Sequence, residues 1–113
     1  MSRKAITAVL DATEIPSAHM AWPVNAAPPL PWMVFRLDED GKLNADNARW
    51  ASHGRWVVEL YQKHADSEIE GKVESAISEA FGDYDKTEIW VDSEDCLMTS
   101  YRFTVIERND SNG

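Results

Sequence analysis

The stretch from Gly54 to Phe81 constrains the fold most, because it joins two different periodicities. From Arg55 to Gln62, apolar residues occupy both faces of an alternating pattern, which predicts a β-strand with two partly covered faces. After it, apolar residues recur at helical spacing as far as Phe81, and Ser67 followed by Glu70 has the spacing of a capping box. The chain therefore contains a strand that leads into an amphipathic helix, and the apolar side of that helix must be covered.

The same patterns predict further elements on either side of this stretch. They are a helix over Arg3–Thr13 and strands over His19–Trp22, Trp32–Leu37, Glu88–Asp92 and Leu97–Glu107. Four prolines between residues 23 and 31 predict an irregular loop with restricted dihedral angles. A turn is expected at Asp38–Gly41, and the polar stretch Lys42–Gly54 is expected to form a projecting arm.

This order of elements predicts the α+β class. We expect an antiparallel sheet of four to five strands with a projecting hairpin, covered by two helices. The 113 residues are enough for a single domain, expected over residues 1–108. Residues 109–113 have nothing to bury and are expected to form a flexible C-terminal tail.

The charge, cysteine content and hydropathy of the sequence limit its partners, its disulfides and its location. The chain has 20 acidic and 11 basic side chains, a formal net charge of −9, which disfavours binding to nucleic-acid phosphates. Cys96 is the only cysteine, so no intrachain disulfide is possible, and we expect an inert thiol. The sequence has no apolar run long enough to span a membrane, and a cytosolic origin is expected.

The sequence predicts no catalytic, cofactor-binding or metal-binding residue. Asp38, Asp40 and Gly41 superficially suggest a calcium loop, but the glycine falls at the fourth position rather than the sixth. The three histidines, His19, His53 and His64, are not spaced as zinc ligands. The acidic residues Asp92, Glu94 and Asp95 could hold a general acid and base, yet a charged turn explains them more simply. We therefore expect a protein that is not an enzyme.

The order of several short motifs resembles that of small tail-completion or tail-terminator proteins of long-tailed bacteriophages and prophages, a family of minor tail and head–tail joining proteins. The motifs are Pro28–Val34, Ala45–Asn47, Val58–Tyr61, an acidic helix that begins near Glu68, Ile89–Glu94 and Tyr101–Phe103. The resemblance implies a ring, commonly a hexamer, at the head-proximal end of the tail tube. It also implies contacts with the tail tube protein and the head connector, assembly in the bacterial cytoplasm, and a place in the virion tail.

A ring requires two different complementary patches on each subunit. The predicted subunit contacts are Ile6, Val9 and Leu10 in the N-terminal helix, and Leu43 and Trp50 in the arm. An acidic lumen would let DNA pass without adhering, because like charges repel. No sequence-specific binding to nucleic acid and no membrane contact are expected.

Two other classes remain open. A small acidic protein-binding module, such as an antitoxin, immunity protein or inhibitor, would bind a basic surface on its partner. A small enzyme that uses the carboxylates around Asp92 is the third possibility.

Overall fold

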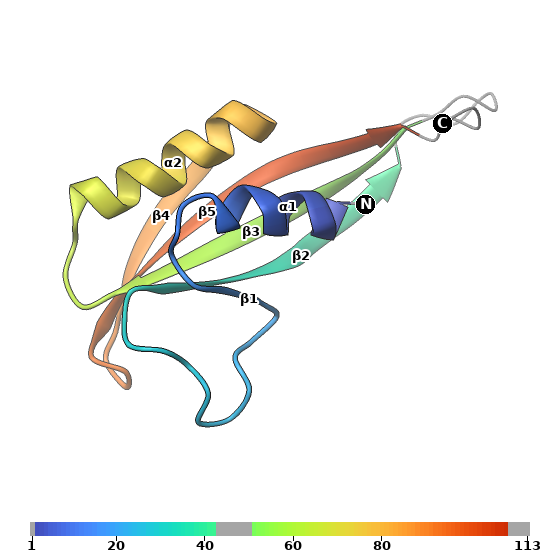
Figure 1. The fold of residues 1–113 in the computed structure, drawn as a ribbon. Helices are drawn as coiled ribbons and strands as arrows, with labels where there is room; N and C mark the ends of the chain where they lie inside the picture. The colour runs from blue at the N-terminus through green and yellow to red at the C-terminus, as the bar shows by residue number, and fades with distance from the viewer. Residues whose placement is uncertain (1, 43–50, 109–113) are drawn as a thin grey trace.

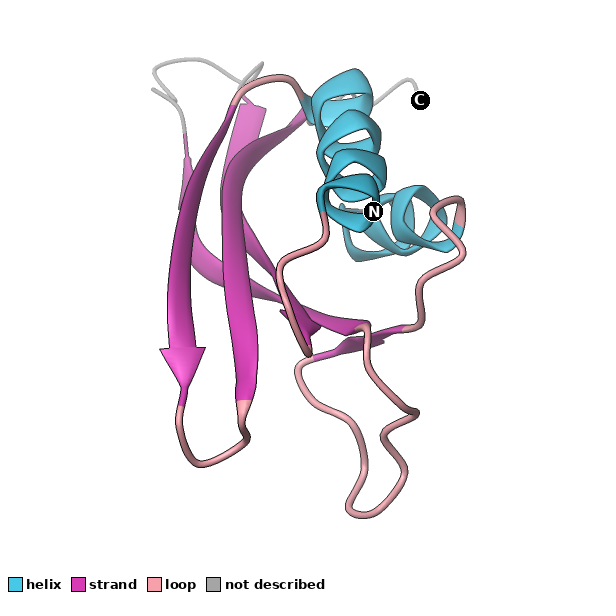
Figure 2. Ribbon diagram, turned by 90° about the vertical axis from the view of Figure 1, so that its left-hand side faces the viewer, coloured by secondary structure: helices cyan, strands magenta, loops and turns pink. Residues whose placement is uncertain are grey.

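The computed structural model describes residues 2–42 and 51–108 and shows two helices packed on one side of a sheet (Figures 1 and 2). The elements in chain order are α1 (Ser2–Asp11), β1 (Ser17–His19), β2 (Trp32–Lys42), β3 (Ala51–Gln62), α2 (Ser67–Phe81), β4 (Tyr84–Val91) and β5 (Cys96–Arg108). The predicted α+β class is confirmed. The predicted tail at residues 109–113 lies outside the described residues.

The described strands form a five-stranded sheet in the order β1-β2-β3-β5-β4. The pairs β2–β3, β3–β5 and β5–β4 are antiparallel, as expected. β1 instead runs parallel to β2, with Ser17 beside Met33, so the sheet is mixed. The cause is the connection through residues 20–31, which returns the chain to the end of the sheet where β1 began and lets both strands run the same way.

The first hairpin is longer than the sequence predicts. β2 continues through Asp38–Gly41, where a turn was expected, and its register with β3 shifts between Leu37 and Glu39. Pairing with β3 is more favourable here than the local turn, because it gives the backbone of these residues hydrogen-bond partners in the neighbouring strand. The predicted contact residues Leu43 and Trp50 lie beyond this paired region, outside the described residues.

The hydrophobic core lies between the two helices and the sheet. β3 and β5 contribute alternate side chains such as Val58 and Phe103, and the rings of Phe81 and Phe103 stack with centroids 5.0 Å apart. α2 contributes Val73 and Ile77, which are fully buried. Burial of these side chains is the main force that holds α2 on the sheet.

The packing of one side of α1 against the core changes the expectation for its apolar residues. Ile6 and Leu10, predicted as subunit contacts, are fully buried in the core of their own chain. The apolar side of this helix is satisfied within the subunit, so these two side chains are not available to a neighbour. Val9 is half-buried and retains accessible surface.

The N-terminus of α2 is capped by Asp66, one residue before the predicted cap. Asp66 has extended backbone angles, and its carboxylate accepts hydrogen bonds from the backbone N–H of Glu68 (3.0 Å) and Ile69 (3.2 Å). Ser67 already belongs to the helix. The Glu70 carboxylate accepts a hydrogen bond from Gln62 Nε2 at 3.0 Å, and a backbone hydrogen bond from Asp66, the cap residue, helps to lower its pKa.

Candidate interaction surface

The sheet face opposite the helices, which we call the open face, carries ion pairs between strands. Arg36 and Glu59 are 3.2 Å apart, Arg102 and Asp38 are 3.6 Å apart, and Arg55 pairs with Asp85. Such exposed pairs contribute about 0–1 kcal/mol each. Their alkyl stems help to cover the apolar centre of the face, where Val57 is fully buried although it points away from the helices, and Val34 is nearly so.

At one end of the open face, side chains from four strands form what we call the apolar row. Its members are aligned by strand register across the sheet: Trp32, Tyr61, Met98 and Ile89. The rings of Trp32 and Tyr61 have centroids 4.5 Å apart, and Trp22 packs edge-on against Trp32 at 6.1 Å. The row therefore crosses four of the five described strands, from β2 to the edge strand β4.

Tyr61 remains a neutral phenol within this row. Burial, and then the negative charge of Glu59, raise the pKa of Tyr61 to about 12. The phenol also donates a hydrogen bond to Glu59 Oε1 at 3.4 Å. Tyr61 thus presents a largely apolar ring whose hydroxyl is held by Glu59, which is typical of an interface residue rather than a proton donor.

The loop between β1 and β2, residues 20–31, is exposed and uncharged. No charged residue occurs from Met20 to Phe35, although charged residues make up 27% of the chain. A turn closed by the Ala26 N–H, which donates to the Pro23 carbonyl at 2.9 Å, presents Val24 to solvent. Met20 is 61% exposed and Val24 is 90% exposed; we call these two side chains the loop patch. The loop projects from the sheet (Figure 1), so both side chains are accessible to a partner.

The opposite edge of the sheet is β4, which exposes Ile89 (56%) and Trp90 (45%), the edge patch. Acidic side chains surround this patch. Between Asp83 and Asp95 there are six acidic residues and one lysine, a formal charge of −5. The edge patch is thus an apolar pair within an acidic border.

The carboxylates considered as a possible reaction centre lie in the turn between β4 and β5. Asp92, Glu94 and Asp95 are exposed there, and backbone hydrogen bonds from Glu94 and Asp95 close the turn. Cys96 follows the turn and is buried; burial, and then the charges of Glu94 and Asp95, raise the pKa of its thiol. A thiol with a raised pKa is a poor nucleophile, consistent with the expected inert role.

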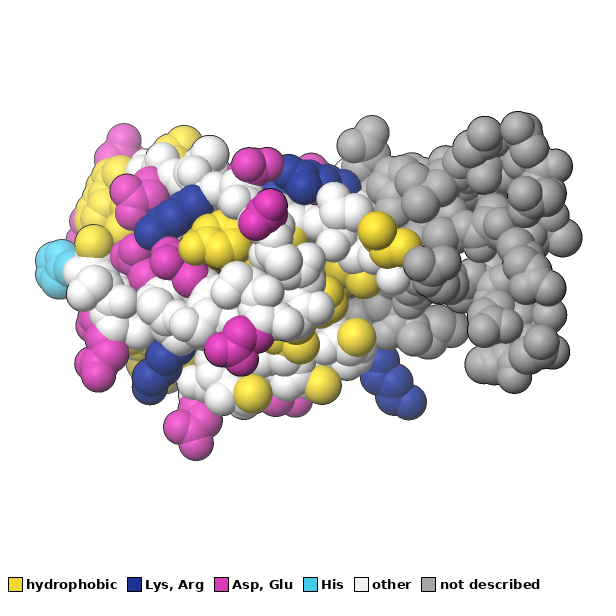
Figure 3. All heavy atoms as spheres, turned by 90° about the horizontal axis from the view of Figure 1, so that it is seen from above, with side chains coloured by type: hydrophobic (Ala, Val, Ile, Leu, Met, Phe, Trp, Pro, Cys, Tyr) yellow, Lys and Arg dark blue, Asp and Glu magenta, His cyan; other side chains and the backbone are white. Residues whose placement is uncertain are grey.

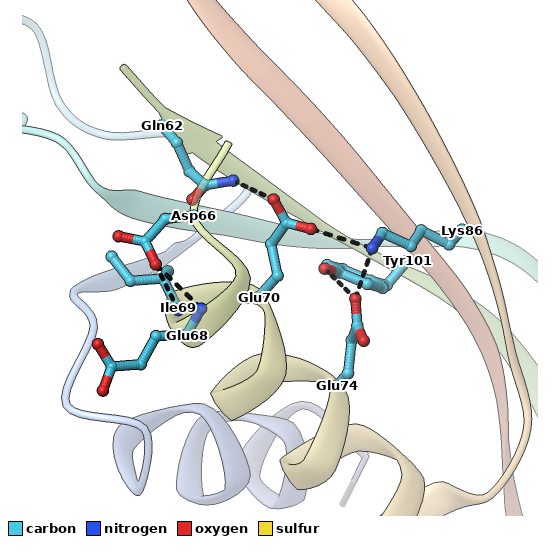
Figure 4. A network of polar contacts seen from close by, with 8 residues as sticks. All are labelled: Gln62, Asp66, Glu68, Ile69, Glu70, Glu74, Lys86 and Tyr101. Atoms are coloured by element: carbon cyan, nitrogen blue, oxygen red, sulfur yellow. Dashed lines mark hydrogen bonds and ion pairs between the residues drawn. The ribbon is translucent and has the colours of Figure 1, made fainter. Parts of the chain in front are cut away.

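A polar network joins α2 to the sheet beneath the helix (Figure 4). Lys86 Nζ lies 3.0 Å from Glu70 Oε1 and 2.7 Å from Glu74 Oε2. Gln62 Nε2 donates to Glu70 at 3.0 Å, and the Tyr101 hydroxyl donates to Glu74 at 2.9 Å. These bonds fix the helix over β3, β4 and β5.

Protonation states in this network follow from its contacts. Burial by itself would raise the pKa of Glu70, but hydrogen bonds from Gln62 and Lys86 outweigh burial and hold that pKa below its ordinary value. The carboxylates of Glu74 and Glu70 raise the pKa of Lys86. Burial, and then the hydrogen bond to Glu74, raise the pKa of Tyr101. The network is therefore a set of fixed charges that orients α2.

A cavity of about 220 Å³ opens beside the start of α2 and is lined in part by Leu30, Pro31, His64 and Ile69. The Asp66 carboxylate also borders it, but that group already accepts the two hydrogen bonds of the helix cap. His19 lies elsewhere, against the rings of Phe35 and Trp56. His19 and His64 therefore do not share a site.

Within residues 2–42 and 51–108, no group of three or more His, Cys, Asp and Glu side chains is placed to hold a metal ion. No helix in this part of the chain combines the length and apolarity needed to cross a membrane. Charged side chains of both signs are interspersed with apolar atoms on the face seen in Figure 3.

The sequence analysis did not identify the loop patch or the edge patch as contact surfaces. The uncharged run from Met20 to Phe35 could have indicated the loop patch, because a stretch without charge is unusual in so acidic a chain. The neighbouring apolar pair Ile89 and Trp90 was another, since adjacent residues in a strand point to opposite faces and an edge strand leaves both accessible.

Comparison with known proteins adds a relationship of fold. A scan of protein families finds no match, and a search of curated proteins finds none. Among solved structures, the chain is similar to one in the "Virion of native gene transfer agent (GTA) particle", with a TM-score of 0.54 and 16% sequence identity. The match covers 90% of this chain and 86% of that chain. At this identity the two chains share a fold, over nearly their whole lengths.

Proposed function

We propose that this chain is a non-enzymatic structural protein of a phage or phage-like particle. The observation that carries the proposal is the fold shared with a virion chain over 90% of the present chain. The order of the sequence motifs supports the same class. The open face and the two exposed apolar patches supply surfaces for assembly.

The specific role that we propose is tail terminator or tail completion. In this role the chain forms a ring, a hexamer in the simplest case, at the head-proximal end of the tail tube. There it stops tube growth and joins the tail to the head, in contact with the tail tube protein and the head connector. A closed ring needs two different patches on each subunit, and the loop patch and edge patch satisfy this requirement. Val9, Leu43 and Trp50 remain predicted contacts.

The net charge of −9 suits a ring through which DNA passes. A negative lumen repels phosphates and keeps the DNA mobile. The electrostatic potential of an assembled ring tests this part of the proposal, and a strongly basic lumen would contradict it.

The experiment that tests the function is the composition of particles from a host that encodes the chain. We expect the protein in purified, nuclease-resistant particles, at a few copies each, by quantitative mass spectrometry. Deletion of its gene should yield tails of irregular length that fail to join heads, and the gene supplied on a plasmid should restore normal tails. Absence from the particles, together with normal particles after deletion, would refute the proposal.

A second candidate, a small acidic module that binds a basic protein, is favoured by the acidic border of β4. It predicts a tight one-to-one complex with a basic partner and no self-association. Equilibrium sedimentation separates the two candidates, because the structural role requires self-association.

A further inference from the structure

We infer that subunits of this protein join head to tail, with the loop patch of one copy (Met20 and Val24) bound to the edge patch of the next (Ile89 and Trp90). The inference rests on the proposed structural role and identifies the surfaces that build the assembly. The partner on each patch is a second copy of this chain.

The position of the two patches allows such a contact. β1, which leads into the loop, is at one edge of the sheet and β4 is at the other. In Figure 2 the loop protrudes on one side of the molecule and the β4–β5 hairpin lies on the other. A contact between opposite edges is heterologous, and such a contact builds a closed ring when its repeated rotation completes a full turn without a rise along the axis.

Charge decides between this contact and a symmetric one. Two β4 edges facing each other would bring together two segments of formal charge −5 each. The loop edge is uncharged, and exposed Arg3 at the start of α1 lies beside it, with Arg3 Nη1 3.4 Å from His19 Nδ1 in β1. The acidic border of one copy therefore meets a neutral to basic surface on the next.

The apolar row leads toward both patches. It ends at Ile89 on the edge strand β4 and at Trp32 on β2, the neighbour of the edge strand β1, and Trp22 of the loop packs against Trp32. Trp22 Nε1 is buried from solvent and has no hydrogen-bond partner among the described residues. Joining the loop patch to the edge patch brings Ile89, on the open face of one subunit, beside the loop of the next, and Trp90 adds apolar surface on the other side of β4.

The loop is also suited to binding because its shape is restricted in advance. Pro23, Pro28, Pro29 and Pro31 fix backbone dihedral angles along it. A loop ordered before contact loses less conformational entropy when it binds.

The test uses one variant in each patch, Val24→Glu and Ile89→Glu, with Ile106→Glu as the matched control. Ile106 is equally exposed (58%) but lies on the inner strand β5, away from both patches. Sedimentation velocity over a range of concentrations measures self-association of the full chain. We expect each patch variant to raise the dissociation constant at least tenfold, roughly the effect of losing a central interface residue, and the control to assemble like the wild type.

Mixing the two patch variants gives the decisive result. Each retains the patch that the other has lost, so an equimolar mixture should form a one-to-one dimer that does not grow further. A symmetric interface gives no such rescue. Met20→Glu and Trp90→Glu serve as a second pair, and circular dichroism confirms folding.

Three outcomes would overturn the inference: a wild-type chain that stays monomeric at every concentration, patch variants that assemble normally, or a mixture that stays monomeric. Failure here is distinct from failure of the proposed function. Rings that form despite both substitutions refute these surfaces and leave the particle role intact. Absence of the protein from particles refutes the role, whereas the mixing experiment still reports on the contact.

Discussion

Glu70 shows how a single acidic side chain can be kept ionised beneath a helix. Only 8% of Glu70 is exposed, and its two carboxylate oxygens are shared between Gln62 and Lys86. Burying a charge is costly unless it is paired and hydrogen-bonded. The contacts with Gln62 and Lys86 therefore allow the Glu70 carboxylate to stabilise the folded chain.

Replacing Lys86 with Met should destabilise the protein, because Glu70 and Glu74 would both lose their cationic partner. We expect a loss of about 2 kcal/mol in the free energy of unfolding at neutral pH. Lys72→Met, on the exposed side of α2, is the matched control and should change stability by less than about 0.5 kcal/mol. Urea unfolding followed by tryptophan fluorescence measures both, and equal effects would contradict the ionic role of Lys86.

The pH dependence of the free energy of unfolding should also show how much the charge of Glu70 contributes. Its pKa in the folded chain is below the ordinary value of 4.5, so its contribution is present above that pH and is lost as the pH falls through the folded pKa. Glu70→Gln should thus be less stable than the wild type at pH 7, with the difference shrinking toward zero in acid. Urea midpoints between pH 7 and pH 3 provide the measurement. A difference that stays constant with pH would show that the charge of Glu70 contributes nothing.

At the scale of elements, α2 is held by its cap and by one buried side. Asp66→Ala should cost about 1 kcal/mol, because the N–H groups of Glu68 and Ile69 lose their acceptor. Ser67→Ala should be nearly neutral, since Ser67 already lies within the helix. Thermal unfolding of the two variants distinguishes the observed cap from the one that the sequence predicted, and a larger effect at Ser67 would favour the latter.

The buried side of α2 provides a second test of the same element. Ile77→Ala should destabilise the protein by about 2–5 kcal/mol, because Ile77 is fully buried and its loss leaves a cavity. Ile106→Ala removes the same atoms from a side chain that is 58% exposed and should cost much less. Urea unfolding compares them; similar losses would mean that α2 does not pack as described.

At the scale of the whole molecule, charge should steer assembly. Arg3→Glu places a negative charge beside the loop edge, so it should slow association with the acidic β4 edge of another copy. Lys72→Glu changes the net charge by the same amount on α2 and should slow association less. Light scattering after dilution jumps measures the rates. The difference between the variants should vanish in 1 M salt, where the Debye length is about 3 Å; a difference that persists there would contradict an electrostatic cause.

The local part of this fold could be read from the sequence. The strand from Arg55 and the helix ending at Phe81 are confirmed because their periodicities, 2 and 3.6 residues, are properties of contiguous residues. The position of the cap was wrong by one residue, since Asp66 and Ser67 are both good capping residues and only the backbone angles decide between them.

Contacts between distant residues required the tertiary structure. Periodicity shows that Ile6 and Leu10 share a helix side, but only packing shows that this side belongs to the core rather than to a neighbour. The same is true of the parallel β1–β2 pair and of the Glu70–Lys86 pair. In each, the sequence of one segment does not predict which other segment it will contact. The sequence by itself determined the order of the helices and strands and the acidic, single-cysteine character of the chain. It placed the first strand at His19–Trp22, whereas β1 is Ser17–His19, because pairing with β2 decides where so short a strand lies. Strand order alone placed the loop patch and edge patch on opposite edges, because which strands become edges depends on pairing across the whole sheet.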